Sequence, residues 1–160
     1  VPEMTFSLAA GLNWKGIDFS ILLQGAARSS IYLQQDIAWD NFWGNYYEEH
    51  IGRWTPETAA TATYPRFTKA ATAAHPNYYK SDYWLKDSKY LRLKNIQLGY
   101  TIPRKLLKKF GVRSLRVYAN AYNLFTWDNV KKVDPESSNN SNGQFYPQQK
   151  VINFGINLNF

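Results

Sequence analysis

The amino-acid sequence predicts an all-β fold: about five C-terminal strands of a large antiparallel transmembrane β-barrel with long extracellular loops. Three observations lead to this fold class. Five segments alternate between apolar and polar residues with a period of two, which is the pattern of β-strands. The connections between them are alternately short and long, and the polar positions are mostly small and neutral. A chain of 160 residues cannot close a wide barrel, so we expect the earlier strands in a longer protein.

The composition excludes several other classes of protein. Aromatic residues make up 17% of the chain, whereas charged residues reach only 19%. The mean hydropathy is negative, and no apolar run approaches the ~18 residues that a transmembrane helix needs. Cysteine is missing, which excludes disulfides and thiolate metal sites. The net charge is +7, but the cations are scattered, with only local groups at Arg104, Lys105, Lys108 and Lys109 and at Lys131 and Lys132, so we predict no nucleic-acid partner.

The alternating segments define the expected strands. They lie near residues 4–14, 17–26, 90–102, 114–127 and 150–160. The first two join at Lys15-Gly16, a pair typical of a tight turn. In the third segment, Leu91 and Leu93 are out of phase with the residues that follow. Two explanations are open: a β-bulge near Lys94 restores the register, or the upper part of this strand stands above the membrane.

The last segment shows the alternation most clearly. From Ile152 to Phe160 every even position is apolar, and every odd position is Asn or Gly. The residues that we expect to face the membrane are Phe154, Ile156, Leu158 and Phe160. A soluble antiparallel sheet also alternates, but its water-exposed face would usually carry more Lys and Glu. The neutral polar face therefore favours a membrane barrel.

The lengths of the connections predict an orientation. The expected outer loops lie near 27–89 and 128–149, whereas the Lys15-Gly16 turn and the stretch 103–113 are short. Outer-membrane barrels have tight periplasmic turns and extended outer loops. We therefore expect the C-terminus on the periplasmic side. The whole of residues 1–160 is then one C-terminal segment of a barrel domain.

The longer loop is rich in aromatic rings, which suits contact with sugar rings or peptides. The candidate ligand-binding residues are Trp39, Trp43, Tyr46, Tyr47 and Trp54, with Asp36, Asp40 and Asn41 as polar partners. The alternative for each ring is packing inside a folded loop or at the membrane interface. Asp36 and Asp40 lack the dense oxygen-ligand pattern of a calcium site, so we predict no metal and no cofactor. We expect Arg53 and Arg66 to brace the loop against its carboxylates.

The sequence contains no convincing catalytic group. His50 and His75 are the only histidines, and no cysteine or nucleophile-elbow serine accompanies them. Glu48 and Glu49 are adjacent, so they would not easily converge as a paired acid and base. We therefore predict that the protein is not an enzyme.

Ordered motifs run along most of the chain and resemble a known family. They are Arg53-Trp54-Thr55-Pro56-Glu57, Tyr64-Pro65-Arg66, Ser81 to Asp87, Tyr90 to Pro103, Arg116-Val117-Tyr118, Asn123 to Thr126, Asp134-Pro135-Glu136, Tyr146-Pro147 and Phe154 to Phe160. The set is similar to the C-terminal part of SusC/RagA-like TonB-dependent outer-membrane transporters of Bacteroidetes type. The family's plug domain and TonB box have no counterpart in this sequence.

The resemblance implies a function and partners. It implies TonB-dependent import of oligosaccharides or peptides across the outer membrane, with a SusD-like surface lipoprotein as a lid and TonB acting through a region outside this chain. Without the resemblance, two other functions fit the residues. One is a soluble carbohydrate-binding β-sandwich, and the other is a passive porin or adhesin barrel without a plug or lid.

Overall fold

The computed structural model describes residues 2–35, 38–40, 46–67, 75–130, 133–137, 146 and 148–160. The strands within these residues are β1 (Met4–Trp14), β2 (Ile17–Ala27), β3 (Ser30–Tyr32), β4 (Leu85–Asp87), β5 (Tyr90–Thr101), β6 (Ser114–Asp128) and β7 (Val151–Asn159). The helical elements are α1 (Arg104–Leu107) and the short 3₁₀ turns η2 (Glu48–Gly52), η3 (Pro76–Tyr78), η4 (Asp82–Trp84) and η5 (Lys108–Phe110). In the described parts of the chain, no helix is long and apolar enough to cross a membrane.

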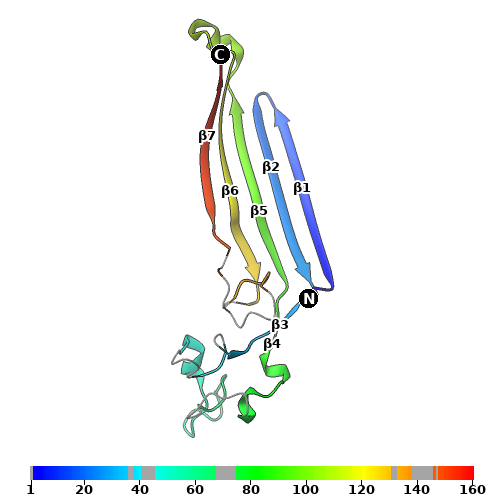
Figure 1. The fold of residues 1–160 in the computed structure, drawn as a ribbon, viewed down its shortest axis with the longest axis vertical. Helices are drawn as coiled ribbons and strands as arrows, with labels where there is room; N and C mark the ends of the chain where they lie inside the picture. Colours follow the sequence, from blue (N-terminus) through cyan, green and yellow to red (C-terminus); the bar gives the residue numbers. More distant parts are fainter. Residues whose placement is uncertain are drawn as a thin grey trace. The chain divides into compact units, whose positions relative to one another are not determined.

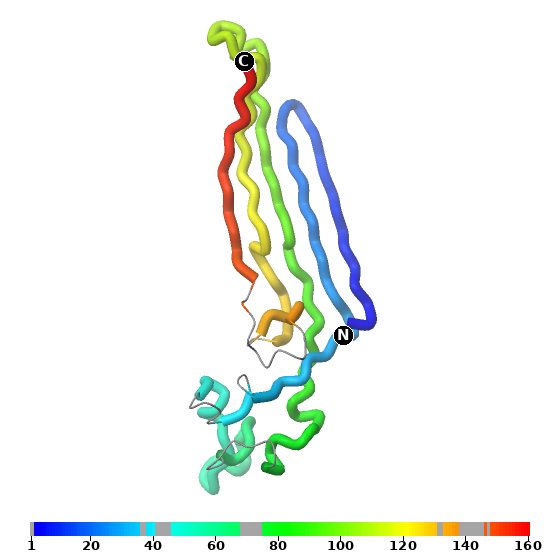
Figure 2. The backbone as a smooth tube through the Cα atoms, in the orientation of Figure 1, coloured from blue at the N-terminus to red at the C-terminus, as the bar shows by residue number. Residues whose placement is uncertain are grey.

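The chain folds as two compact units. The first, which we call the sheet unit, comprises Pro2–Ser29, Lys89–Asn129 and Pro147–Phe160. Its strands pair antiparallel in the order β1-β2-β5-β6-β7, and Figures 1 and 2 show them as long strands lying side by side. The second, the loop unit, comprises Ser30–Ser88 and Val130–Tyr146 and contains the short β3-β4 pair.

Strand pairing places the apolar positions of all five long strands on one face of the sheet. One row of directly paired residues is Leu12, Phe19, Leu98, Ala119 and Phe154. The neighbouring row is Gly11, Ser20, Gln97, Asn120 and Asn153. Directly paired residues point to the same side of a sheet, and successive residues point to opposite sides. The sheet therefore has an apolar face, which carries the first row, and a polar face, which carries the second.

The phase change in β5 is a β-bulge at Lys94. Leu22 of β2 pairs with Asn95, but its neighbour Leu23 pairs with Leu93, so Lys94 is the extra residue. The bulge brings Leu93 onto the apolar face, where it also pairs with Phe125 of β6. The observed strand pairing therefore contains the β-bulge near Lys94 that was the first of the two explanations for the phase change.

The apolar face carries large side chains that the described residues leave exposed. They are Phe6, Leu8, Leu12, Trp14, Ile17, Leu98, Tyr100, Val117, Phe125, Trp127, Ile152, Phe154, Ile156 and Leu158. Phe154 is 82% exposed. Each such side chain forgoes about 2 kcal/mol when it stays in water, and a whole domain is typically stable by only about 5–15 kcal/mol. An apolar medium or another part of the protein must therefore cover this face.

Aromatic residues mark both ends of the apolar face. Trp14 and Tyr100 lie in the row at the end with the short connections, and Phe6, Phe125 and Trp127 lie at the other end. Eight residues separate Phe6 from Trp14, or about 27 Å along a strand. A tilt of about 40° reduces this to roughly 20 Å across a bilayer, close to the apolar band between the aromatic girdles of outer-membrane barrels. The dimensions fit a membrane-spanning sheet.

Candidate ligand-contact surfaces

The polar face of the sheet is a hydrogen-bonding surface with few charges. Asn153 Nδ2 donates to Asn120 Oδ1 across β6 and β7 at 3.0 Å. Nearer the opposite end, Arg92 Nε donates to the Thr126 hydroxyl at 2.9 Å. Exposed side chains such as Asn153 offer donors and acceptors to a polar solute, whereas Arg92 is buried and serves the sheet itself. This surface is suited to lining a water-filled conduit.

An ion pair crosses three strands on this face. Arg116 of β6 reaches over β5 to Asp18 of β2, and its Nε donates to Asp18 Oδ1 at 2.9 Å. The contact requires Gly99 on the strand between them, because a Cβ there would lie 2.5 Å from both Arg116 Nη2 and Asp18 Oδ1. Tyr118 packs beside this pair, with its ring centroid 4.8 Å from the Arg116 guanidinium carbon. This ion pair neutralises two charges on the polar face, and the sequence did not predict it.

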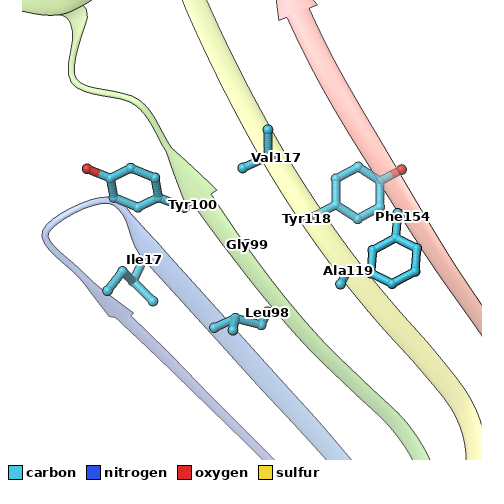
Figure 3. A pocket seen from close by; sticks show the side chains of 8 residues that line it. All are labelled: Ile17, Leu98, Gly99, Tyr100, Val117, Tyr118, Ala119 and Phe154. Carbon is cyan, nitrogen blue, oxygen red and sulfur yellow. The ribbon is translucent and has the colours of Figure 1, made fainter.

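The apolar face contains an open hollow of about 540 Å³. Figure 3 shows its side chains, which come from β2, β5, β6 and β7. The lining consists of Ile17, Leu98, Tyr100, Val117, Ala119 and Phe154 of the apolar face, together with Gly99 and Tyr118, which lie between them in the strands and whose positions belong to the polar face. A sugar or peptide would find almost no hydrogen-bonding partners on this lining, and an acyl chain needs none. We therefore do not assign this hollow to a polar ligand.

The loop unit has an aromatic core of its own. Its buried residues are Ile31, Leu33, Ala38, Trp39, Tyr64, Tyr78, Trp84 and Val130. Trp39 stacks on Tyr78 with 4.5 Å between the ring centroids, and Trp84 Nε1 donates to the Asn77 carbonyl at 2.9 Å. Among the candidate ligand-binding rings, Trp39 thus packs inside this unit, where it is not available to a ligand.

Polar groups in this core are tied to particular partners. The Tyr78 hydroxyl donates to the buried carboxylate of Asp40, and the Tyr64 hydroxyl donates to the Ala38 carbonyl at 2.7 Å. Burial raises the pKa of the Tyr64 phenol well above its ordinary range, and the charge of Asp40 adds to this rise. Tyr64 therefore stays neutral and remains a hydrogen-bond donor at physiological pH.

His50 is part of the same core. Its Nδ1 accepts from the Tyr47 backbone N–H at 3.0 Å, and its Nε2 lies 3.4 Å from the Ala38 carbonyl. The ring also packs against Tyr64, with centroids 4.6 Å apart. Both ring nitrogens face backbone groups of the loop, so the histidine holds the loop together. In the described residues, no group of three His, Cys, Asp or Glu side chains is placed to hold a metal ion.

A hollow of about 480 Å³ lies on the loop unit around Trp54. It is lined by Arg53, Trp54, Thr55, Pro56, Arg66 and Phe67. The Arg53 guanidinium lies 5.0 Å from the centroid of the Phe67 ring. The expectation that Arg53 and Arg66 brace the loop against carboxylates is wrong for the described residues, because neither forms an ion pair there. Both residues instead line the hollow together with the exposed Trp54 ring.

The predicted ligand-contact residues fall into three groups. Trp39 and Asp40 are buried in the loop-unit core. Tyr46 and Trp54 are exposed, and Tyr47 is half-buried. Asp36, Asn41 and Trp43 lie outside the described residues. Trp54 lines the hollow described above, and neither Arg53 nor Arg66 was among the predicted contacts. The only sequence signal for that hollow was the closeness of an arginine, a tryptophan and a proline in residues 53–56.

Comparison with known proteins gives consistent results. No protein-family model matches the chain. The TonB-dependent receptor P26 of Formosa agariphila is 29% identical over 177 residues, which cover all of this chain and 17% of that protein. The TonB-dependent receptor SusC of Bacteroides thetaiotaomicron is 25% identical, over 99% of this chain and 15% of its own length. The chain thus spans about one sixth of these relatives.

Solved structures show the same fold. The structure of the RagAB peptide importer in its open-open state matches 100% of this chain and 17% of its own, with a TM-score of 0.75 and 23% identity. A second RagAB structure, of the peptide transporter, matches 98% of this chain with the same TM-score. The sheet and these similarities together define the class of protein. The strands match those in the barrel of a TonB-dependent outer-membrane transporter. Within that class the chain is similar in sequence to SusC-like receptors and in fold to part of the RagAB peptide importer.

Proposed function

We propose that this chain forms part of a TonB-dependent importer that carries oligosaccharides or peptides across the outer membrane under a SusD-like surface lipoprotein. The observation that supports it most is the pairing register, which gives one sheet an apolar face and a neutral hydrogen-bonding face. Lipid covers the first face, and the second lines the route of the solute. No covalent chemistry is required, only binding followed by a gated conformational change.

The orientation follows from the connections. The two short connections, at Lys15-Gly16 and between β5 and β6, leave the same end of the sheet. This end, with the C-terminus of β7, faces the periplasm, and the long connections face outward. The loop unit therefore belongs to the extracellular capture surface, where the lipoprotein closes over the bound ligand.

Trp54 is the strongest candidate for ligand contact among the described residues. Its exposed ring offers a flat apolar surface to a sugar ring or an apolar side chain. The two neighbouring guanidinium groups, of Arg53 and Arg66, would donate hydrogen bonds to hydroxyl or carboxylate oxygens of the same ligand. Tyr46 and Trp43 remain proposed contacts of the same loop.

Uptake in whole cells tests the proposal. A strain that lacks the full-length protein is supplied with labelled oligosaccharide and peptide mixtures, with and without a functional TonB. Loss of uptake of one mixture in both mutant strains is the expected result. Uptake that persists without TonB would instead assign the barrel to passive diffusion. Replacement of Trp54 by Ala, with Tyr79→Ala as an exposed control ring of the same unit, then locates the ligand contact.

A further inference from the structure

The connection between β5 and β6 carries a cluster of positive charge. Its cations are Arg104, Lys105, Lys108, Lys109 and Arg113. Residues 102–113, which we call the basic connection, contain no Asp or Glu. In the described parts of the chain, none of these five cations forms an ion pair with a carboxylate. The import mechanism makes no use of this charge, since it lies beyond the strand ends.

The basic connection also exposes two large apolar side chains. Leu106 is 65% exposed and Phe110 is 76% exposed, whereas Leu107 between them is 7% exposed and holds the helical turn to the sheet unit. Leu106 and Phe110 both belong to the short helical segment formed by α1 and η5, and both are exposed there. Exposed apolar residues flanked by lysines are the pattern of a segment lying in a membrane interface.

The position of the basic connection brings it next to the lipid-facing surface. Its two ends are held by backbone hydrogen bonds, from Ile102 N to the Leu115 carbonyl and from Arg113 N to the Asn159 carbonyl, both at 2.8 Å. The apolar face ends here with the exposed rings of Trp14 and Tyr100. The basic connection therefore begins where the aromatic girdle ends, at the depth of lipid headgroups.

We propose that the basic connection binds anionic phospholipid headgroups of the leaflet at this end of the barrel. Leu106 and Phe110 enter the boundary between headgroups and acyl chains, and the lysine and arginine side chains reach the phosphates. With the orientation given above, this is the periplasmic leaflet. The inference rests on the barrel and its orientation and not on import, so a failure of transport leaves it untouched.

Lipid enrichment around the full-length transporter tests the charge. The protein is reconstituted in nanodiscs of mixed phosphatidylglycerol and phosphatidylcholine, and spin-labelled lipids report which headgroup is enriched at its surface. Each cation near an anionic surface changes affinity roughly fivefold. The double substitution Lys108→Gln and Lys109→Gln should therefore lower the phosphatidylglycerol preference by up to roughly 25-fold. The matched control, Lys80→Gln with Lys86→Gln, removes equal charge from the loop unit and should leave the preference unchanged.

The depth of the Phe110 position in the membrane provides a second readout, and the substitution at this position removes no charge. A nitroxide attached after Phe110→Cys should be relaxed by oxygen and protected from a water-soluble nickel complex. A nitroxide attached after Lys105→Cys should show the opposite pattern. Equal nickel access at both positions, or an unchanged phosphatidylglycerol preference in the lysine variant, would overturn the proposal. Protection of both labels irrespective of lipid composition would assign the basic connection to a protein contact and would overturn it as well.

Discussion

The two units of this chain differ in where their apolar side chains lie. The loop unit buries its own rings: Trp39, Tyr78 and Trp84 pack together, and the polar atoms of Tyr78 and Trp84 form hydrogen bonds inside the unit. The sheet unit leaves apolar residues such as Phe154 exposed, and its backbone hydrogen bonds join neighbouring strands. The loop unit therefore carries the basis of its stability within itself. The sheet unit depends on what surrounds it, namely lipid on one face and the rest of the barrel at its edges.

The largest expected effect is the loss of a ring from the loop-unit core. Trp84→Ala should destabilise the loop unit by about 3–5 kcal/mol, because it removes a buried indole and leaves a cavity. The barrel itself should assemble normally. Limited proteolysis on intact cells checks the loop, and heat-modifiable gel mobility checks the barrel. Tyr79→Ala, which removes an exposed ring from the same unit, should alter neither. Loss of the barrel in the Trp84 variant would show that the two units are not independent.

A charge placed on either face of the sheet distinguishes lipid from water. Ile96 lies in the middle row of the apolar face, and Gln97 is its neighbour on the polar face. Ile96→Arg should cost about 2–4 kcal/mol in urea unfolding of the folded barrel. Gln97→Arg should cost much less, because its side chain enters the aqueous conduit. Equal costs for the two variants would contradict the assignment of the faces.

The contact between Tyr118 and Gly155 gives a smaller effect within the sheet. An alanine Cβ at position 155 would overlap the Tyr118 ring and displace it from its place beside Arg116. Gly155→Ala should cost about 1–3 kcal/mol. Gly11→Ala is the matched control, because a Cβ there meets only the Phe19 carbonyl at an ordinary 3.6 Å. If both glycine variants unfold at the same urea concentration, the ring does not depend on the glycine.

The smallest effect concerns one hydroxyl and its response to pH. Tyr64→Phe removes the hydrogen bond to the Ala38 carbonyl and should cost the loop unit about 1 kcal/mol. The folded-state pKa of Tyr64 lies above that of an unfolded tyrosine, near 10. The stabilising contribution is therefore complete below about pH 10 and is lost as the pH rises further. Protease protection of the wild-type loop should fall more steeply with alkaline pH than that of the variant. Parallel curves would rule out this role of Tyr64.

Much of the sheet could be predicted because alternation is a local property of the sequence. Ile152 to Phe160 shows its two faces without any knowledge of its neighbours, and the observed strand β7, Val151–Asn159, covers all of these residues but the last. The bulge at Lys94 could be suspected from the phase of Leu91 and Leu93, but only the pairing with β2 and β6 locates it. The comparison of short and long connections also needed nothing beyond the sequence.

The contacts of the candidate site could not be predicted in the same way. Trp39 and Trp54 are equally aromatic in the sequence, and only tertiary packing decides that the first is buried and the second exposed. Asp18 and Arg116 are 98 residues apart, and their pairing depends on a glycine in a strand between them. Long-range contacts of this kind leave no local pattern.

Cysteine accessibility along β7 tests the assignment of the two faces most directly. Single cysteines are introduced at each position from Ile152 to Leu158 except Gly155 in the full-length transporter and treated in intact membranes with a water-soluble maleimide. Positions 153 and 157 should react from the aqueous conduit, and positions 152, 154, 156 and 158 should be protected by lipid; position 155 is left out because a side chain there meets the Tyr118 ring. Uniform reactivity, or protection of the odd positions with labelling of the even ones, would contradict the membrane-spanning sheet.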